Sequence, residues 1–187
     1  MSRLPNCHIR RGNSNQFATS EDFQKLFTDE LDSLYYLSFL LTCDQDLAEK
    51  CFLAGLEDCI KTNRVFKEWA RSWARRTIVH NAIRELKPRP RYTGSSVSST
   101  VSPYIDQQSS RGDGDVGAVL ALEDFERFVF VMSVLEHYSD GDSALLLGCF
   151  LVDIRNARTR AVARIVSSSP ASVSSEINFE QARELSR

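Results

Sequence analysis

Two groups of arginines are the residues whose types and spacing could do chemistry in this 187-residue sequence. The first lies within residues 61–91, which hold ten bases against two acids, and the second lies within residues 154–165. Guanidinium groups bind phosphate oxygens, so the chemistry they could do is to hold a polyanion such as nucleic acid. The net charge is only −2, but residues 20–60 hold ten acids against two bases. Local fields therefore favour a polyanion at the basic segments.

The second group of arginines falls in a predicted pair of short helices. Ser139 followed by Asp142 has the spacing of a capping box, and Gly148 ends the apolar run that follows. A second helix is predicted by apolar residues that share one face: Ile154, Ala157, Ala161 and Ile165. Such a pair is typical of a helix-turn-helix, in which the second helix lies along a DNA groove. The alternative is an ordinary solvated helix, which also carries arginines.

The first group of arginines falls on a helix predicted from about Phe66 to Leu86. Trp69 and Trp73 follow Phe66 at helical spacing, so we predict that both lie in the core rather than stack on bases. The polar side of this helix is either a solvated face or a face toward DNA. It comprises Arg71, Arg75, Arg76, His80, Asn81 and Arg84.

Catalytic and metal-binding patterns are absent from the sequence. Its three histidines stand beside no nucleophile motif, and it has no phosphate-binding glycine loop and no paired zinc-ligand spacing. The five cysteines are odd in number and include no CxxC, which predicts reduced and mostly buried thiols. We therefore expect no enzyme activity, no metal and no cofactor. The sequence also has no apolar run long enough for a membrane span and no signal peptide, so a cytoplasmic protein is expected.

Helical periodicity recurs along the chain and no strand-like alternation competes with it. Apolar residues recur over residues 21–41, over 47–60 after a cap at Asp44 or Asp46, and again over 118–137. Residues 88–117 are rich in Ser, Gly and Pro. The expected fold is all-α, with two small helical modules and a helix-turn-helix in the second. The predicted divisions are a tail at 1–19, a domain at 20–87, a flexible linker at 88–117, a domain at 118–166 and a tail at 167–187.

The order of these parts resembles that of bacterial RNA polymerase sigma factors, in particular the two-domain extracytoplasmic-function group. The segment FKEWARSWARRTIVHNAIREL is similar to the family's F-x-x-W-L-x-x-I-A-x-N helix in region two, which melts the minus-ten promoter element. The segment from Ala121 to Ile165 is similar to region four, with its G-x-S-x-x-E-I-A-x-x-L-G-x-S pattern, which reads the minus-thirty-five element. The resemblance covers residues 20–87 and 118–166.

This resemblance implies a transcription protein that binds promoter DNA and directs core RNA polymerase to initiate. An anti-sigma factor is a further possible partner. Ile154, Arg155, Asn156 and Arg160 fall on recognition-helix positions. The residues expected to face DNA near the melted segment lie on the helix predicted from Phe66 to Leu86, and they are Arg71, Arg75, Arg76, His80, Asn81 and Arg84. The predicted region-four contacts to promoter DNA are Arg155, Asn156, Arg158 and Arg160.

Departures from the family pattern keep two other hypotheses open. Lys50, Leu53 and Ala54 stand where the family has the Asp-x-x-Gln-Glu that binds the polymerase clamp, and Phe150 stands where a capping serine is usual. The first alternative is a degenerate sigma-like protein that acts as an interaction module. The second is a helix-turn-helix regulator that binds DNA without polymerase.

Overall fold

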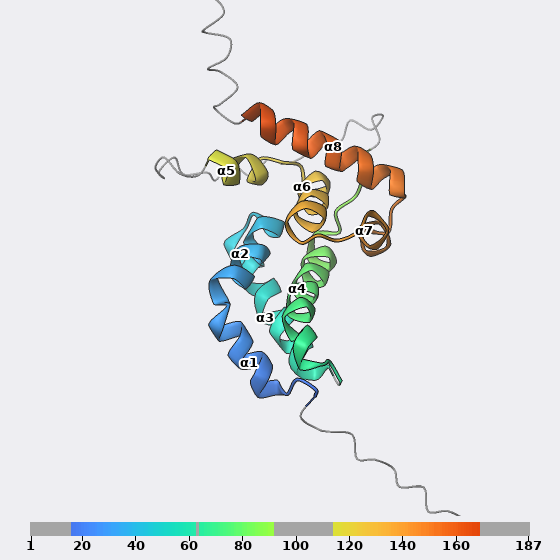
Figure 1. Ribbon diagram of the computed structural model, residues 1–187. Helices are drawn as coiled ribbons and strands as arrows, with labels where there is room; N and C mark the ends of the chain where they lie inside the picture. The colour runs from blue at the N-terminus through green and yellow to red at the C-terminus, as the bar shows by residue number, and fades with distance from the viewer. Residues whose placement is uncertain (1–15, 63, 92–113, 169–187) are drawn as a thin grey trace, which may run out of the picture.

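The computed structural model describes residues 16–62, 64–91 and 114–168, and these residues form helices joined by turns (Figure 1). The predicted all-α class is confirmed. In chain order the helices are α1 (Ser20–Asp29), α2 (Leu31–Thr42), α3 (Gln45–Lys61), the 3-10 turn η1 (Lys67–Trp69), α4 (Ala70–Leu86), α5 (Gly114–Leu120), α6 (Asp124–Phe130), the π-helical segment η2 (Val131–Leu135), α7 (Asp140–Leu147) and α8 (Leu151–Ser168).

Side-chain caps fix where the first helices begin. At α1 the Thr19 hydroxyl accepts from the Asp22 N–H at 3.2 Å, while the Asp22 carboxylate accepts from the Thr19 N–H at 2.9 Å. At α3 the Asp44 carboxylate accepts from the Leu47 N–H at 2.8 Å, so Asp44 is the cap. Each of these bonds satisfies an N–H group that has no partner within the helix. The helical spacing over residues 21–41 hides a break at Glu30, where α1 ends and α2 begins.

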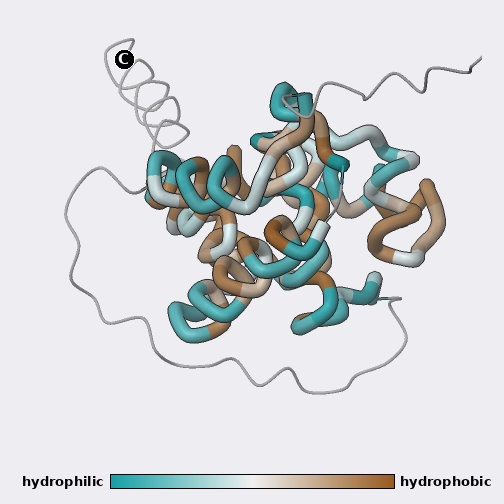
Figure 2. Tube along the Cα trace, turned by 90° about the horizontal axis from the view of Figure 1, so that it is seen from below, coloured by the Kyte–Doolittle hydropathy of each residue, from teal (hydrophilic) through white to brown (hydrophobic). Residues whose placement is uncertain are grey.

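Helices α3 and α4 pack closely at Gly55. A Cβ atom built on Gly55 would lie 2.8 Å from Cγ1 of Ile78, which is fully buried. Ala74 and Ala82 also have no exposed surface, so small residues on α4 allow the close approach. Figure 2 shows that the helices carry both hydrophobic and hydrophilic stretches, as expected for amphipathic elements around one core.

The start of α4 differs from the predicted helix. The turn η1 replaces the first helical turn, and Trp69 is 59% exposed, so the prediction that Trp69 lies in the core is wrong. The tighter 3-10 winding breaks the helical spacing that relates Trp69 to the buried face. Trp73 is partly buried and packs against the core, as predicted. Phe66 lies between Phe17, stacked at 4.8 Å, and Trp69, edge-on at 5.2 Å.

The chain just before α1 is held against the loop that precedes α4. The N–H of Ala18 donates to the Val65 carbonyl at 2.7 Å, and the N–H of Lys67 donates to the Gln16 carbonyl at 2.9 Å. These bonds and the stacked phenylalanines place residues 16–18 in the fold, whereas the sequence predicts a tail up to residue 19. Residues 1–15 lie outside the described part.

The second group of helices departs from its prediction at two places. Helix α5 begins at Gly114, inside the segment predicted as linker, and Val119 at its end is buried. The helical spacing over residues 118–137 is also interrupted after Leu120, before α6 begins at Asp124. Leu122 is buried in the turn between them, which explains why the apolar pattern continues through a break in the helix.

The two groups of helices, α1–α4 and α5–α8, pack against each other. Helix α6 contacts α2, and α7 contacts α4 (Figure 1). Arg127 of α6 is 3% exposed and donates from Nε and Nη2 to the Leu41 carbonyl, both at 3.2 Å. Most of the predicted linker, residues 92–113, lies outside the described part, so the division into two modules stays a prediction.

The described cysteines are free thiols with different exposure. Cys51 and Cys59 are fully buried, Cys149 is partly buried and Cys43 is exposed, while Cys7 lies outside the described part. Burial raises the pKa of both Cys51 and Cys59 to about 11, which keeps these thiols protonated at neutral pH. Among the described helices, none combines the length and the apolar character that crossing a membrane requires.

Candidate nucleic-acid interface

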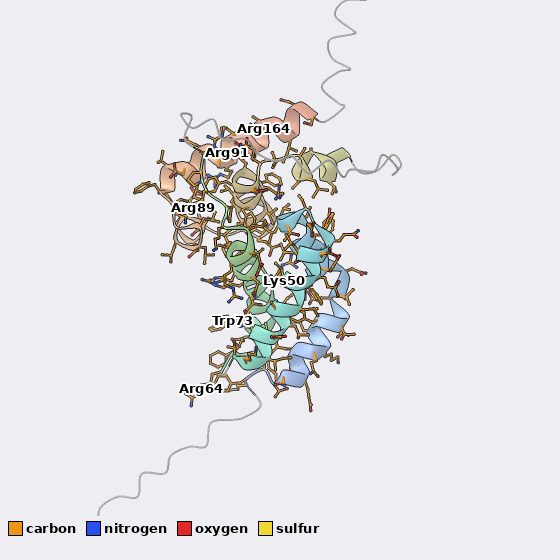
Figure 3. The ribbon with its side chains drawn as sticks, turned by 180° about the vertical axis from the view of Figure 1, so that it is seen from behind. Lys50, Arg64, Trp73, Arg89, Arg91 and Arg164 are labelled. Carbon is orange, nitrogen blue, oxygen red and sulfur yellow. The ribbon has the colours of Figure 1, made fainter. Side chains whose placement is uncertain are left out.

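The two predicted groups of arginines lie on different parts of the molecule. Figure 3 shows Arg164 on α8 at one end and Trp73 farther down, on α4. The structure therefore does not merge the two groups into one site. Each group lies on its own helix, where other residues fix its side chains.

Arg71 and Arg75 project from the first half of α4 and pair with carboxylates. Arg71 Nε donates to Glu30 at 2.8 Å, and its side chain remains 66% exposed. Arg75 makes two hydrogen bonds to Glu136, one of them from Nε at 2.6 Å, and a third to the Ser33 hydroxyl at 3.0 Å. The bonds to Glu136 raise the pKa of the Arg75 guanidinium above its ordinary value. Because Glu136 follows η2, this pair joins the two groups of helices.

Arg76, His80 and Arg84 lie farther along the same helix and are exposed. Burial lowers the pKa of His80, and the nearby positive charges of Arg76 and Arg84 lower it further. The lowered pKa favours the neutral imidazole, which can donate or accept a hydrogen bond on this surface.

Asn81 does not lie on this surface, which corrects the prediction that it faces DNA. It is 2% exposed, and its amide donates to Asp58 at 2.9 Å and to the Thr77 carbonyl at 2.8 Å. Its oxygen accepts from Arg84. A buried amide with these partners holds α4 against α3 and anchors Arg84. Periodicity could not show this, because Asn81 stands next to the exposed positions and its partner Asp58 is distant in sequence.

A groove of about 620 Å³ runs between α4 and the segment that leads into α7. It is lined by Trp69 and Trp73, by the arginines Arg71, Arg75 and Arg76, and by residues 135–138. The Nε1 atom of Trp73 is buried and has no hydrogen-bond partner within the described part of the chain. Cations beside an exposed indole are the groups that hold a nucleic-acid strand, through phosphates and base stacking.

The second group of arginines is positioned by α7 and α8. The Ser139 hydroxyl accepts from the Asp142 N–H at 3.0 Å, which caps α7, and Gly148 at φ 61° ends it in the left-handed conformation. Two residues later α8 begins and continues for 18 residues. Its predicted inner face is confirmed: Ile154, Ala157 and Ala161 are fully buried, and Ile165 is partly buried against the core.

All four arginines of α8 form ion pairs with acids of the same group of helices. Arg155 Nε lies 3.3 Å from Asp140, which also accepts from Arg158. On the other flank, Glu126 of α6 is 3% exposed and accepts from Arg160 Nε at 2.7 Å. The second oxygen of Glu126 lies 2.9 Å from Arg164 Nη1, close enough for an ion pair although the two groups form no hydrogen bond. These pairs orient the guanidinium groups, whose exposed parts remain open to solvent.

Two of the predicted contacts, Arg155 and Asn156, lie near the start of α8. Both are exposed, and the Arg155 side chain is 62% exposed despite its pair with Asp140. Residues near the start of a recognition helix are the ones that reach base edges in a major groove. Arginine and asparagine form paired hydrogen bonds with guanine and adenine edges, so this end of α8 could read bases.

The positions that depart from the family's polymerase-binding pattern lie on α3. Lys50 Nζ pairs with Glu85 of α4 at 2.7 Å, and Figure 3 shows Lys50 on this part of the molecule. Leu53 is 49% exposed and Ala54 is partly buried. The surface there offers an apolar side chain and a paired lysine. In the described part of the chain, no group of three or more His, Cys, Asp or Glu side chains could hold a metal ion.

Of three comparisons with known proteins, two found no match and one found a similar solved structure. No protein-family model matches the sequence, and no curated protein matches it. Among solved structures, the chain is similar to the co-crystal structure of the sigma factor RpoE in complex with the anti-sigma factor NepR from Bartonella quintana. The two chains are 19% identical, the match covers 79% of this chain and 96% of that chain, and the TM-score is 0.44. A likeness of this size carries no function across.

Proposed function

We propose that this chain is a sigma-factor-like transcription protein that binds promoter DNA through α8 and α4 and directs RNA polymerase to initiate. One observation supports the proposal above others: a short capped helix and a tight turn precede an 18-residue helix with a buried inner face. Near its start this helix exposes Arg155 and Asn156. In this function Arg158 and Arg160, set on its flanks, bind phosphates, while Arg155 and Asn156 reach base edges.

The face of α4 has the second role in this function. Arg71, Arg75 and Arg76 bind the backbone of the melted strand, and the exposed indole of Trp69 stacks on an unpaired base. The proposed DNA contacts thus include Trp69, which the sequence pattern does not predict as one, and exclude the buried Asn81. Two weak DNA-binding surfaces in one chain raise each other's effective concentration on a promoter that carries both elements.

DNA binding is tested by fluorescence anisotropy with a labelled random-sequence duplex over a range of salt concentrations. We expect the Arg155→Ala/Arg158→Ala variant to lose about tenfold in affinity and to show a salt slope smaller by roughly one, because only Arg158 of the two binds a phosphate. The matched control is Arg64→Ala, because Arg64 is exposed at the end of the molecule away from α8 (Figure 3). The proposal fails for α8 if both variants bind with the affinity and salt slope of the native chain.

Polymerase binding is tested separately by co-elution of the native chain with bacterial core RNA polymerase on a sizing column. Co-elution at low and moderate salt is the expected result. Its absence at both, with the chain folded, rejects the initiating role and leaves a second candidate, an interaction module that binds another protein. The observation that favours this candidate is that Lys50 is already paired with Glu85 beside the exposed Leu53.

A further inference from the structure

A second cavity, besides the groove described above, lies between the end of α3 and the outer side of α4. Its volume is about 510 Å³, which is within the usual range for a small-molecule site. Its walls come from α1–α4 alone, so the cavity does not depend on how that group packs against α5–α8. We call it the α3–α4 cavity, and the residues on which its chemistry depends are Asp58, Lys61, Trp73, Arg76, His80 and Arg84.

The charges of the α3–α4 cavity leave one cation without a partner. The only carboxylate among the described residues that line it belongs to Asp58, and the cations are Lys61, Arg76 and Arg84. Lys61 pairs with Glu57 at 3.0 Å, and Arg84 lies 3.6 Å from Asp58. Arg76 has no hydrogen bond or ion pair within the described part of the chain. Its charge is therefore available to an anion.

His80 stands between two of these cations. Arg76, His80 and Arg84 follow one another at intervals of four residues, which places them in one row along α4. Burial lowers the pKa of His80, the charges of Arg76 and Arg84 lower it further, and Asp58 opposes these effects. An anion in this row would meet two guanidinium groups and an imidazole that can donate a hydrogen bond.

The α3–α4 cavity also has an apolar wall. Trp73 and Ile83 line it, and both are partly buried against the core. Trp73, labelled in Figure 3, lies three residues before Arg76 on α4. From Trp73 to Arg84 the helix rises about 16 Å. These positions suit an elongated ligand that carries a flat ring at one end and anionic groups along the rest.

We propose that the α3–α4 cavity binds a free nucleoside polyphosphate, with its base against Trp73 and its phosphates along the row of Arg76, His80 and Arg84. Guanidinium groups match phosphate oxygens in geometry and charge, and a base packs on an indole as another aromatic ring does. The inference goes beyond the proposed function and does not rest on it, because a chain that binds no promoter keeps the same cavity. A nucleotide within a single strand shares this chemistry, so the test separates the two sources.

The test is isothermal titration calorimetry of the full-length chain with ATP and with GTP, in buffer without divalent cations. We expect a Kd below about 1 mM for at least one of them, which is the range in which enzymes bind cellular substrates. Adenosine or guanosine alone and inorganic pyrophosphate should each bind at least about tenfold more weakly, because each lacks either the phosphate contacts or the base contact.

Two variants locate the site. Arg76→Gln should raise the Kd about tenfold, because a hydrogen bond to a charged group is lost. The change should leave the fold intact, since Arg76 is exposed and pairs with no other side chain in the described part. The matched control Lys25→Gln removes one positive charge from an exposed position of α1, which contributes nothing to the cavity. It should change the Kd less than about twofold.

A second readout uses the imidazole inside the cavity. Nucleotide binding should raise the pKa of His80, because the phosphate charges favour the imidazolium and oppose the effect of Arg76 and Arg84. The pKa is measured by an NMR pH titration of the histidine ring protons. The chain has three histidines, and the signal that disappears in His80→Asn identifies the ring.

Four results would overturn the proposal. The first is no binding of either nucleotide below about 1 mM. The second is equal weakening in Arg76→Gln and Lys25→Gln, which indicates non-specific attraction by charge. The third is pyrophosphate that binds as tightly as the nucleotide, which means that the base is not held. The fourth is a His80 pKa that responds to a single-stranded oligonucleotide but not to ATP or GTP, which assigns the cavity to a strand.

Discussion

The ion pair between Arg75 and Glu136 should contribute more to stability than any surface pair, because Glu136 is withdrawn from water. The Glu136 side chain is 6% exposed and the Arg75 side chain 26% exposed. Glu136→Gln keeps the size and one acceptor but removes the charge. It leaves a partly buried guanidinium without the counter-charge of its hydrogen-bonded partner, although the negative charge of Glu30 still acts on it.

The expected magnitude follows from these two exposures. Breaking a fully buried pair by removing one partner costs about 3–5 kcal/mol, and a hydrogen bond to a charged group contributes about 1.5–3 kcal/mol. Arg75 keeps its bond to Ser33 and some contact with solvent. The loss should therefore be closer to the value of one hydrogen bond to a charged group than to the cost of breaking a fully buried pair. We expect Glu136→Gln to reduce the free energy of unfolding by about 2 kcal/mol, which lowers Tm by roughly 4–8 °C for a chain of this size.

Urea unfolding followed by circular dichroism measures this loss, with Glu57→Gln as the matched control. Glu57 pairs with Lys61 at 3.0 Å on the surface, where the two side chains are 67% and 70% exposed. The control should lose at most about 0.5 kcal/mol, and added salt should abolish that loss. Equal losses in the two variants, or a loss in Glu136→Gln that disappears in salt, would refute the reasoning from burial.

Two further perturbations follow from the first group of helices. Gly55→Ala places a methyl group against Ile78, and overpacking of about 1–3 kcal/mol outweighs the gain in helix propensity of up to about 1 kcal/mol, so urea unfolding should show net destabilisation. In an Ile78→Ala background the same change should become neutral or stabilising, and an unchanged loss there would rule out the steric cause. Hydrogen bonds from Thr19 and Lys67 lower the pKa of Asp22 to about 2, below its ordinary value near 4. The stability that the Asp22 carboxylate contributes is therefore complete above about pH 5 and is lost as the pH falls toward 2. A stability difference between the native chain and Asp22→Asn that does not shrink over that range would contradict this assignment.

Local signals in the sequence predicted local features well. Asp44 and Gly148 occupy the cap and turn positions that their residue types favour, and the inner face of α8 follows from spacing alone. These features depend on interactions within about four residues, which a single sequence displays directly. The all-α class follows for the same reason.

Features that depend on distant residues could not be predicted in this way. Trp69 keeps helical spacing in the sequence, but the bridge between residues 16–18 and 65–67 goes with a 3-10 turn that exposes it. The burial of Asn81 depends on Asp58, and the pairing of Arg75 depends on Glu136, 61 positions away. For the candidate interface, the sequence therefore identified the helices and their basic residues, while the partners of those residues required the structure.

Arg127 links the fraying of one helix to the separation of the two groups. The Leu41 carbonyl stands in the last turn of α2, where carbonyl groups have no acceptor role within the helix, and Arg127 of α6 supplies the missing donors. A cation at that end also opposes the negative end of the helix dipole. If the two groups of helices separate, α2 loses the hydrogen bonds that Arg127 donates to its last turn. That turn should then unwind together with the separation. Opening of the molecule and local unfolding of α2 are then one cooperative event, and amide exchange near Thr42 would report how often the molecule opens.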